Sequence, residues 1–425
     1  MLSLFLFILF ILLICLNVPI AFVLLSVSLT YVVMKGVPFE LVGHVMTHTI
    51  NSFIMIAIPL FILAGKLMEE SQITDKILDF SNDLVGWIPG GLGHVNVTGS
   101  MIFAGMSGSA VADAGGLGNV ELAIMKKAGY DDEFSVGITA ASATIGPIIP
   151  PSLFFILYGA ICQVSVGKLF LAGAIPGLLM GISLMVRIYL HALKHDYPKA
   201  SFPKFRQILG STKRASLPLL TPMIILGGII SGIFTPTEAA AVASFYALIL
   251  GKFIYGTLTW KAIYRSVVYS VFVTAMVAFI MAIAGVFGWI LTAEGITNGF
   301  SDFMLSITSD KWMFLLIILG ILGVMGMFIE EAAIMIMTLP ILYPLLGVYG
   351  VDPVHFGVVM TLCLVIGMLT PPFGLLLYTL SAITKKPVDW VFKATYPYLI
   401  PLAITLLLIT FVPITCLWLP SLFFR

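Results

Sequence analysis

The sequence predicts an all-α polytopic membrane protein with two inverted-topology repeats, each containing a re-entrant helical hairpin and a broken transmembrane helix. Composition is the first reason, because 60% of the 425 residues are hydrophobic and only 10% are charged, whereas roughly a quarter of a soluble domain is charged. The second is the recurrence of long apolar runs. The third is a pair of matching interruptions inside such runs, IGPIIPP at 145–151 and IGMLTPP at 366–372.

Ten apolar runs are candidate spans, because each approaches the length that a helix needs to enter or cross the hydrocarbon core. They lie at about 2–16, 18–34, 51–67, 134–160, 164–190, 217–234, 237–255, 266–292, 354–383 and 395–420. In the runs 134–160 and 354–383, adjacent prolines remove backbone donors and break the helix. Such backbone is tolerated at membrane depth only against protein or a polar cavity, and paired breaks indicate the binding site of a secondary transporter.

Two further apolar stretches, 88–127 and 312–348, are interrupted near their middles. We interpret both as re-entrant hairpins, which enter and leave the membrane on the same side. Their predicted tips carry polar residues, namely Ser107, Ser109 and Asp113 in the first and Glu330 and Glu331 in the second.

The positions of lysine and arginine predict the orientation. If neither hairpin makes a net crossing, five connections share one side of the membrane: 66–87, 121–133, 193–216, 251–265 and 385–393. They hold 16 Lys and Arg residues, against 4 in the connections and terminus on the other side. Basic residues accumulate in cytoplasmic loops, so we expect the first set, including the basic loop 193–216, to be cytoplasmic.

The same order of elements occurs twice. Residues 1–192 hold three spans, a hairpin, a broken span and a final span, and residues 217–425 hold the same series. Five net crossings in each half would invert the second half relative to the first, as in many secondary transporters. Residues 193–216 are then the cytoplasmic linker between the repeats.

The first hairpin tip and the facing break form the first candidate site. Ser107 and Ser109 offer hydroxyls, Asp113 offers a carboxylate, and the break offers carbonyl oxygens that have lost their helical donors. Hard cations prefer several oxygen ligands, and an ionisable residue inside a membrane is by default a functional hypothesis. The alternative is that the two serines only pack a tight helix contact. We predict a Na⁺ site formed by Ser107, Ser109, Gly146, Ile149 and Pro150, with Ser107, Ser109 and Asp113 also available to substrate.

The second candidate site mirrors the first, with Glu330 and Glu331 facing Gly367 and Thr370. Adjacent helical residues point about 100° apart, so we expect one glutamate to face the site, and symmetry favours Glu330. This glutamate could also cap a half-helix N-terminus. Half-helix N-termini at both tips suit an anionic substrate group such as a carboxylate.

At 105–113, 146–151, 235–239 and 367–372 the sequence resembles the large membrane subunit of tripartite ATP-independent periplasmic (TRAP) transporters, and the resemblance covers essentially the whole chain. It implies an elevator-type fold like that of other sodium-coupled carriers of organic anions, with Na⁺ as the coupling ion. It also implies a soluble periplasmic substrate-binding protein and a separate small four-helix membrane subunit as partners.

The family pattern would also assign residues. In the first half, ion or substrate binding would fall on Ser107, Ser109, Asp113, Gly146, Ile149 and Pro150. In the second half it implies a Na⁺ site at Gly326, Glu330, Gly367, Thr370 and Phe373, with Glu330 and Thr370 also near substrate. Glu330 stands where members often have aspartate.

We therefore expect the large permease subunit of a Na⁺-coupled, binding-protein-dependent importer of organic anions, of the sialic acid or C4-dicarboxylate class, in a bacterial inner membrane. A stand-alone anion/Na⁺ symporter of the same fold is the alternative. An intramembrane serine protease is a more remote one, because Gly105-Met106-Ser107-Gly108 has the GxSG form; it would need a histidine at membrane depth. The GxxxxGK[ST] motif of nucleotide hydrolysis does not occur in the sequence.

Overall fold

A computed structural model describes residues 2–16, 18–71, 73–195 and 197–424, and every regular element in these ranges is a helix. The first half contains α1 (Leu2–Cys15), α2 (Ile20–Lys35), α3 (Phe39–Ile50), η1 (Phe53–Ile56), α4 (Ala57–Glu70), α5 (Thr74–Val85), α6 (Gly91–Ser107), α7 (Ala110–Gly115), α8 (Leu117–Lys127), α9 (Asp132–Ala143), α10 (Leu153–Cys162) and α11 (Val166–Ala192). The second half contains α12 (Phe205–Ile230), α13 (Pro236–Ile249), η2 (Leu250–Ile254), α14 (Trp260–Ala293), α15 (Ile296–Ile307), α16 (Lys311–Gly326), α17 (Glu331–Val348), α18 (Pro353–Gly367), α19 (Leu375–Thr384), α20 (Val388–Phe411) and α21 (Ile414–Phe423).

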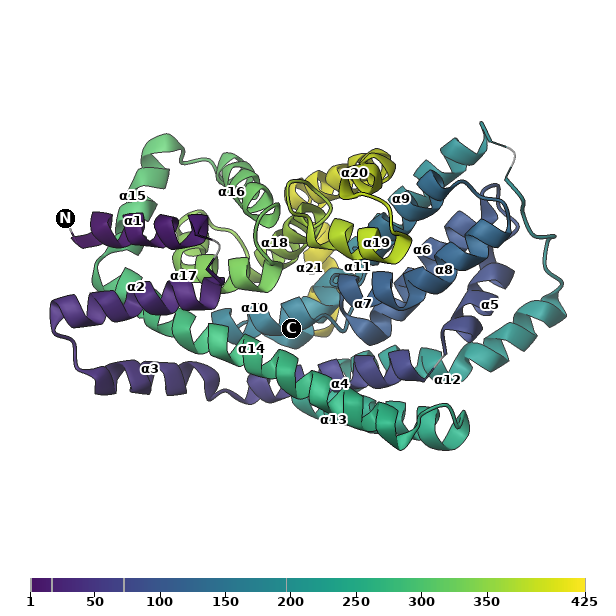
Figure 1. The fold of residues 1–425 in the computed structure, drawn as a ribbon, viewed down its shortest axis with the longest axis horizontal. Coiled ribbons are helices and arrows are strands. Elements are labelled where there is room, and N and C mark those ends of the chain that lie inside the picture. The colour runs from purple at the N-terminus through teal and green to yellow at the C-terminus, as the bar shows by residue number, and fades with distance from the viewer. Residues whose placement is uncertain (1, 17, 72, 196, 425) are drawn as a thin grey trace.

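One long flank of the molecule is built from α3, α4, α12, α13 and α14 (Figure 1). Helix α14 has 34 residues and extends about 51 Å at 1.5 Å per residue. Side-chain hydroxyls of α13 and α14 bond to the backbone of α4. Ser244 of α13 donates to the Leu60 carbonyl at 2.6 Å, and Ser270 of α14 donates to the Pro59 carbonyl at 2.6 Å. Such bonds between helices hold the flank together where apolar surroundings supply no hydrophobic drive.

The core of the molecule contains the two hairpins (α6–α8 and α16–α17), the broken helices (α9–α10 and α18–α19) and the helices α11 and α20. Its contacts are reciprocal between the halves. Helix α9 packs on α20 and α18 packs on α11, while α7 packs on α19 and α17 packs on α10. Glycine permits one of these crossings, because a Cβ on Gly137 of α9 would collide with the Ala394 carbonyl of α20. The halves therefore interlock in the core.

The predicted membrane-protein class agrees with the helix lengths. Among the described residues, six helices are long and apolar enough to cross a membrane, or up to eight if each of two bent pairs counts as one span. The helices are interrupted near the predicted positions: α6 and α16 end close to the expected tips, α9 ends at Ala143 ahead of the first break, and α18 ends at Gly367 ahead of the second proline pair. The Thr235 side chain caps α13 in a capping box with Glu238.

Three elements differ from the sequence prediction. Residues 39–50 form α3 and residues 296–307 form α15, although both stretches were assigned to connections, because their polar residues lower the mean hydropathy of a span-sized window. The predicted final span 395–420 is divided into α20 and α21. That division falls at Pro413, whose nitrogen cannot donate to the preceding turn.

Candidate functional site

The first hairpin turns at a glycine. Helix α6 ends at Ser107, Gly108 has a φ of +61°, and the Ser109 side chain caps α7 by accepting from the Ala112 N–H at 3.4 Å. A Cβ on Gly108 would be strained at this φ and would collide with the Pro151 carbonyl. Glycine therefore lets the tip lie directly against the first break.

The first break contacts the same tip from the other side. A Cβ on Gly146 would lie 3.2 Å from the carbonyl oxygen of Ser109. The Pro150 carbonyl oxygen lies 3.8 Å from the position that a Cβ on Gly105 would take. Backbone atoms of the tip and of the break thus meet without intervening side chains.

Several oxygens at this junction have no donor. Among the described residues, none donates a hydrogen bond to the carbonyl oxygens of Gly146, Ile149 or Pro150. The Ser107 hydroxyl is buried and also lacks a partner. Unpartnered buried oxygens are costly unless something else satisfies them, and a cation bound by oxygen ligands would do so.

The second hairpin tip repeats this geometry with a carboxylate. Glu330 precedes α17 as Ser109 precedes α7, and its side chain accepts from the Ala333 N–H at 3.2 Å. The capping role considered for Glu330 is therefore present. In each hairpin, the capping side chain accepts from the third residue after it.

The second break packs on its own hairpin through two glycines. A Cβ on Gly367 would lie 2.8 Å from the Cα of Gly326. The Phe373 N–H donates to the Met327 carbonyl at 3.1 Å, which ties the end of the break to the tip. No described residue donates to the carbonyls of Gly326, Thr370 or Phe373, whereas the Gly367 carbonyl accepts from the Thr370 N–H at 2.9 Å.

A cavity of about 180 Å³ lies between the two tips and is called here the central cavity. Ser107, Ser109 and Glu330 of the predicted set line it, together with Pro151 and Met368 beside the two breaks. The structure thus brings the tips of both halves to one space.

Both glutamates of the second tip line the central cavity, whereas the sequence predicted only one. The reason is local. Glu330 has an extended backbone, with ψ of 140°, so the helical separation of adjacent side chains does not apply to it. Glu331 is 2% exposed, and its Oε2 atom has no hydrogen-bond partner among the described residues.

The central cavity is not lined by eight of the predicted residues, namely Gly146, Ile149, Pro150, Gly326, Gly367, Asp113, Thr370 and Phe373. Asp113 is buried in α7, 1% exposed, with both carboxylate oxygens unpartnered among the described residues. The Thr370 hydroxyl donates to the Ile366 carbonyl at 3.1 Å within its own turn. Phe373 has a half-exposed ring 6.1 Å from that of Phe328, so its carbonyl and not its side chain is available to the site.

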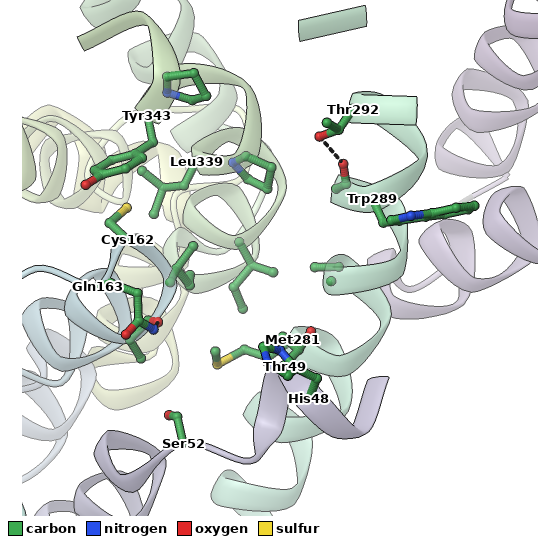
Figure 2. A pocket seen from close by; sticks show the side chains of 18 of the residues that line it. His48, Thr49, Ser52, Cys162, Gln163, Met281, Trp289, Thr292, Leu339 and Tyr343 are labelled. Atoms are coloured by element: carbon green, nitrogen blue, oxygen red, sulfur yellow. Dashed lines mark hydrogen bonds between the residues drawn. The ribbon is translucent and has the colours of Figure 1, made fainter. Parts of the chain in front are cut away.

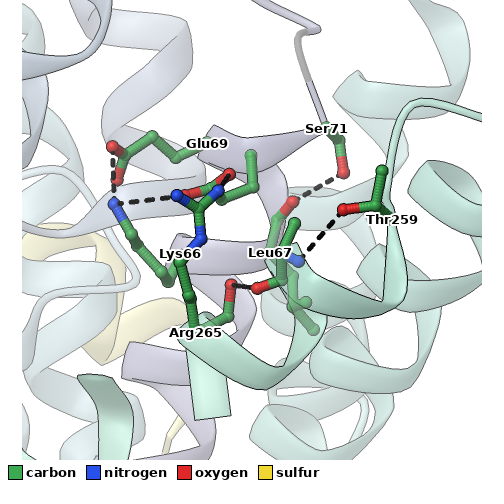
Figure 3. Close-up of polar contacts among 9 residues, drawn as sticks. Lys66, Leu67, Glu69, Ser71, Thr259 and Arg265 are labelled. Carbon is green, nitrogen blue, oxygen red and sulfur yellow. Dashed lines mark hydrogen bonds and ion pairs between the residues drawn. The ribbon is translucent and has the colours of Figure 1, made fainter. Parts of the chain in front are cut away.

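Charged residues of α4 line one wall of the central cavity, and the sequence prediction did not include them. Lys66 and Glu69 both contribute, and their side chains pair at 2.8 Å (Figure 3). Arg265 of α14 pairs with Glu70 at 3.2 Å in the same cluster. The available signal was the position of Lys66 at the end of an apolar run, where a lysine side chain can reach along the helix.

A second and larger cavity, about 680 Å³, lies further along the same helices (Figure 2). It is called here the outer cavity, and its polar wall includes His48, Ser52 and Gln163. Helix α14 lines the central cavity near Val273 and the outer cavity from Met281, about 12 Å further at 1.5 Å per residue. Helices α10 and α17 also line both cavities.

This arrangement suits ion and anion binding, not covalent chemistry. The Ser107 hydroxyl contacts no histidine among the described residues, so the base that a serine nucleophile requires is missing from the GxSG segment. The central cavity instead combines free oxygens for a cation with a lysine and the N-terminus of α10, whose cap is the neutral Ser152. An anion is stabilised at such an N-terminus.

Comparisons with known proteins agree with this description. Residues 7–415 match the family described as tripartite ATP-independent periplasmic transporter, DctM component. The chain is 45% identical over 413 residues to the sialic acid TRAP transporter large permease protein SiaM of Vibrio cholerae, covering 96% of each chain.

It is also 38% identical to the C4-dicarboxylate TRAP transporter large permease protein DctM of Pseudomonas aeruginosa, over 88% of this chain and 87% of that protein. Among solved structures, the crystal structure of the Alcanivorax borkumensis YdaH transporter has a TM-score of 0.62 over 90% of this chain and 89% of that chain. At 14% identity this likeness shows a shared fold.

Proposed function

Because this chain belongs to the DctM component family and is a large membrane subunit of a TRAP transporter, we propose that it imports a sialic-acid-like sugar acid together with Na⁺. The central cavity is the observation that carries this proposal, since it joins oxygen-rich tips from both halves in one space. The relative named for sialic acid is 45% identical to this chain and the relative named for C4-dicarboxylates is 38% identical, which favours the sugar acid.

Na⁺ binding is supported by the free oxygens at the two junctions. The first site would use the hydroxyls of Ser107 and Ser109 with the carbonyls of Gly146, Ile149 and Pro150, and the second would use Gly326, Glu330, Thr370 and Phe373 near Gly367. Carbonyls freed at broken helices coordinate Na⁺ in other secondary transporters.

The charges around the central cavity suggest how Na⁺ and an anion are coupled. Glu330 and Glu331 place two carboxyl groups in the cavity wall, and an ionised carboxylate repels an anionic substrate. Na⁺ at the second junction would offset this repulsion, so the anion binds well only after the cation. Lys66, which also lines the cavity, would then hold the substrate carboxylate together with the N-terminus of α10.

Movement of the core along the flank would connect the two cavities. Within the flank, Ser244 and Ser270 bond to the backbone of α4, whereas the core is interlocked by its own reciprocal contacts. We propose that the inverted repeats 1–192 and 217–425 form this elevator. The positive-inside pattern favours a cytoplasmic position for the Lys66 end of α4.

The proposed partners are a small membrane subunit beside the flank and a periplasmic substrate-binding protein. Uptake of labelled sialic acid into proteoliposomes holding both membrane subunits tests the whole proposal. We expect uptake that requires the binding protein and an inward Na⁺ gradient and is unaffected by ATP. Equal uptake with choline in place of Na⁺ would overturn the coupling, and uptake without the binding protein would favour a stand-alone symporter.

A further inference from the structure

A buried carboxyl group lies inside the first hairpin, away from its tip. Glu121 of α8 is 3% exposed, and its Oε2 atom accepts from the Asn96 side-chain N–H of α6 at 2.6 Å. The same amide donates to the Thr139 hydroxyl of α9 at 2.8 Å, and the Ser142 hydroxyl donates to the Asn96 carbonyl oxygen at 2.6 Å. Glu121 thus belongs to a polar network that joins both arms of the hairpin to the first broken helix.

No positive side chain compensates Glu121. None of the ion pairs among the described residues includes it, and its Oε1 atom has no hydrogen-bond partner there. Two other acids belong to the surrounding helices: Asp113 is buried in α7, which packs on α8, and the exposed Asp79 of α5 lines the same cavity as Glu121. Asn96 is the polar residue of α6 that contacts Glu121, and the buried length of α9 consists of the uncharged residues 134–143.

An ionised carboxylate in this setting would be strongly disfavoured, because a buried charge needs a partner and a second carboxylate adds repulsion. Inside a membrane protein that need is greater still. The group must therefore acquire one positive charge from outside the protein.

A cavity connects the Glu121 carboxyl group with the solution. About 250 Å³ of space between α5, α6 and α8 reaches from Asp79 and Asn82 at the surface to Asn96 and Glu121 inside. Water can occupy a polar space of this size. Solvent therefore reaches Glu121 without passing through the central cavity.

We propose that Glu121 is a proton-binding site, protonated in the described state and exchanging its proton with the solution through this cavity. A metal cation fits less well, because Asn96 presents its N–H group and not its oxygen to Glu121, as the hydroxyl of Ser142 on the amide oxygen requires. Loss of the proton would place a charge between α6, α8 and α9, the helices that support the first hairpin tip. Proton binding at Glu121 thus affects the hairpin independently of Na⁺.

The test compares thermal unfolding of the full-length protein in nanodiscs between pH 5 and pH 9, in choline and in Na⁺, for the wild type and Glu121→Gln. A proton bound by the folded state and already released by the unfolded chain makes stability fall as pH rises. We expect the variant to match the wild type at pH 5 and to exceed it by a margin that grows with pH. The matched control Asp79→Asn, an exposed acid at the cavity mouth, should follow the wild type.

A constant difference between the variant and the wild type at all pH values would overturn the proposal. So would a Na⁺-dependent stabilisation that Glu121→Gln alone removes, because that result assigns a sodium ion to the site. Infrared spectroscopy gives a second readout if the variant folds poorly. The wild type should show the C=O stretch of a protonated carboxyl group at neutral pH, and Glu121→Gln should lose this band. If Asp113→Asn loses the band and Glu121→Gln keeps it, the proton is bound by Asp113 and the proposal is overturned.

Discussion

Gly326 and Gly367 meet backbone to backbone, 41 positions apart in sequence, where the second hairpin crosses the second broken helix. A Cβ on Gly367 would lie 2.8 Å from the Cα of Gly326, and the Cβ of Gly326 would lie 3.2 Å from the Cα of Gly367. Since a real Cβ essentially never approaches a heavy atom so closely, any side chain here must push the helices apart. The position of the free carbonyls at Gly326, Thr370 and Phe373 depends on this contact.

We expect Gly367→Ala to weaken Na⁺ activation of uptake, because overpacking of a helix crossing costs about 1 to 3 kcal/mol and displaces the carbonyls. The measurement is uptake against Na⁺ concentration in proteoliposomes. Gly320→Ala, on the hairpin arm that carries Gly326, is the control, because a Cβ at Gly320 meets nothing within 4 Å. Equal Na⁺ curves for the two variants would show that the crossing does not shape an ion site.

Ser107→Ala should lower apparent Na⁺ affinity by about ten-fold or more, because a hydrogen-bonding or ligand contact to a charge is worth about 1.5 to 3 kcal/mol. Stability without Na⁺ should be unchanged, since the Ser107 hydroxyl has no hydrogen-bond partner to lose among the described residues. Ser183→Ala, whose hydroxyl bonds only within its own helix, is the control. A variant with normal Na⁺ dependence would leave Ser107 as a packing residue.

Lys66→Gln should raise the KM for the substrate about ten-fold with a smaller effect on Na⁺ affinity. The reason is that one charge near a partly screened carboxylate contributes on the order of 1 to 4 kcal/mol. Glu69→Gln releases Lys66 from its 2.8 Å pair and should not raise KM. If both variants raised KM equally, the pair would act as a structural link and the lysine would not be a substrate contact.

A disulfide between the flank and the core should stop transport. The position of a Cβ on Gly288 of α14 lies 3.2 Å from the Cβ of Pro340 of α17, near the spacing of a disulfide. We expect Gly288→Cys with Pro340→Cys, in a background without the native cysteines, to lose uptake on oxidation and regain it on reduction. Full uptake in a protein shown to be cross-linked would exclude sliding of the core.

The ion pair between Lys35 and Glu294 predicts a pH-dependent contribution to stability. The two groups pair at 2.7 Å, and the Tyr31 hydroxyl donates to Glu294 at 2.8 Å. Hydrogen bonds from Lys35 and then from Tyr31 lower the pKa of Glu294, and the bond to Glu294 raises the pKa of Lys35.

A lowered carboxyl pKa stabilises the fold above the unfolded value of about 4.3 and loses this effect as pH falls through the folded value. The raised pKa of Lys35 stabilises the fold at acid and neutral pH, and this stabilisation is lost only when the pH rises through the lysine pKa in alkali. Glu294→Gln should therefore lower Tm at pH 7, and the deficit should shrink as the medium is made more acid than pH 4. Glu40→Gln on α3 is the control, and a deficit that persists in acid would contradict the ionic origin.

The sequence by itself determined the features that depend on local backbone chemistry. Adjacent prolines at 150 and 151, and again at 371 and 372, remove two backbone donors in succession and so favour a break in the helix. The broken helices, the hairpin tips at Gly108 and near Gly326 and the apolar spans could therefore be predicted with their residue numbers. The serines and Glu330 of the tips followed from the same pattern.

Only the tertiary structure decided which groups share a cavity. The sequence gives no distance between Ser109 and Glu330, which are separated by more than two hundred residues, and no reason to place Lys66 beside them. It also suggested Asp113 for the substrate, whereas the fold buries this side chain in α7, outside the lining of the central cavity. Which side chains share a cavity depends on close helix crossings such as that of Gly326 with Gly367. At these crossings the packing between distant segments, and not local preference, fixes the direction of each side chain.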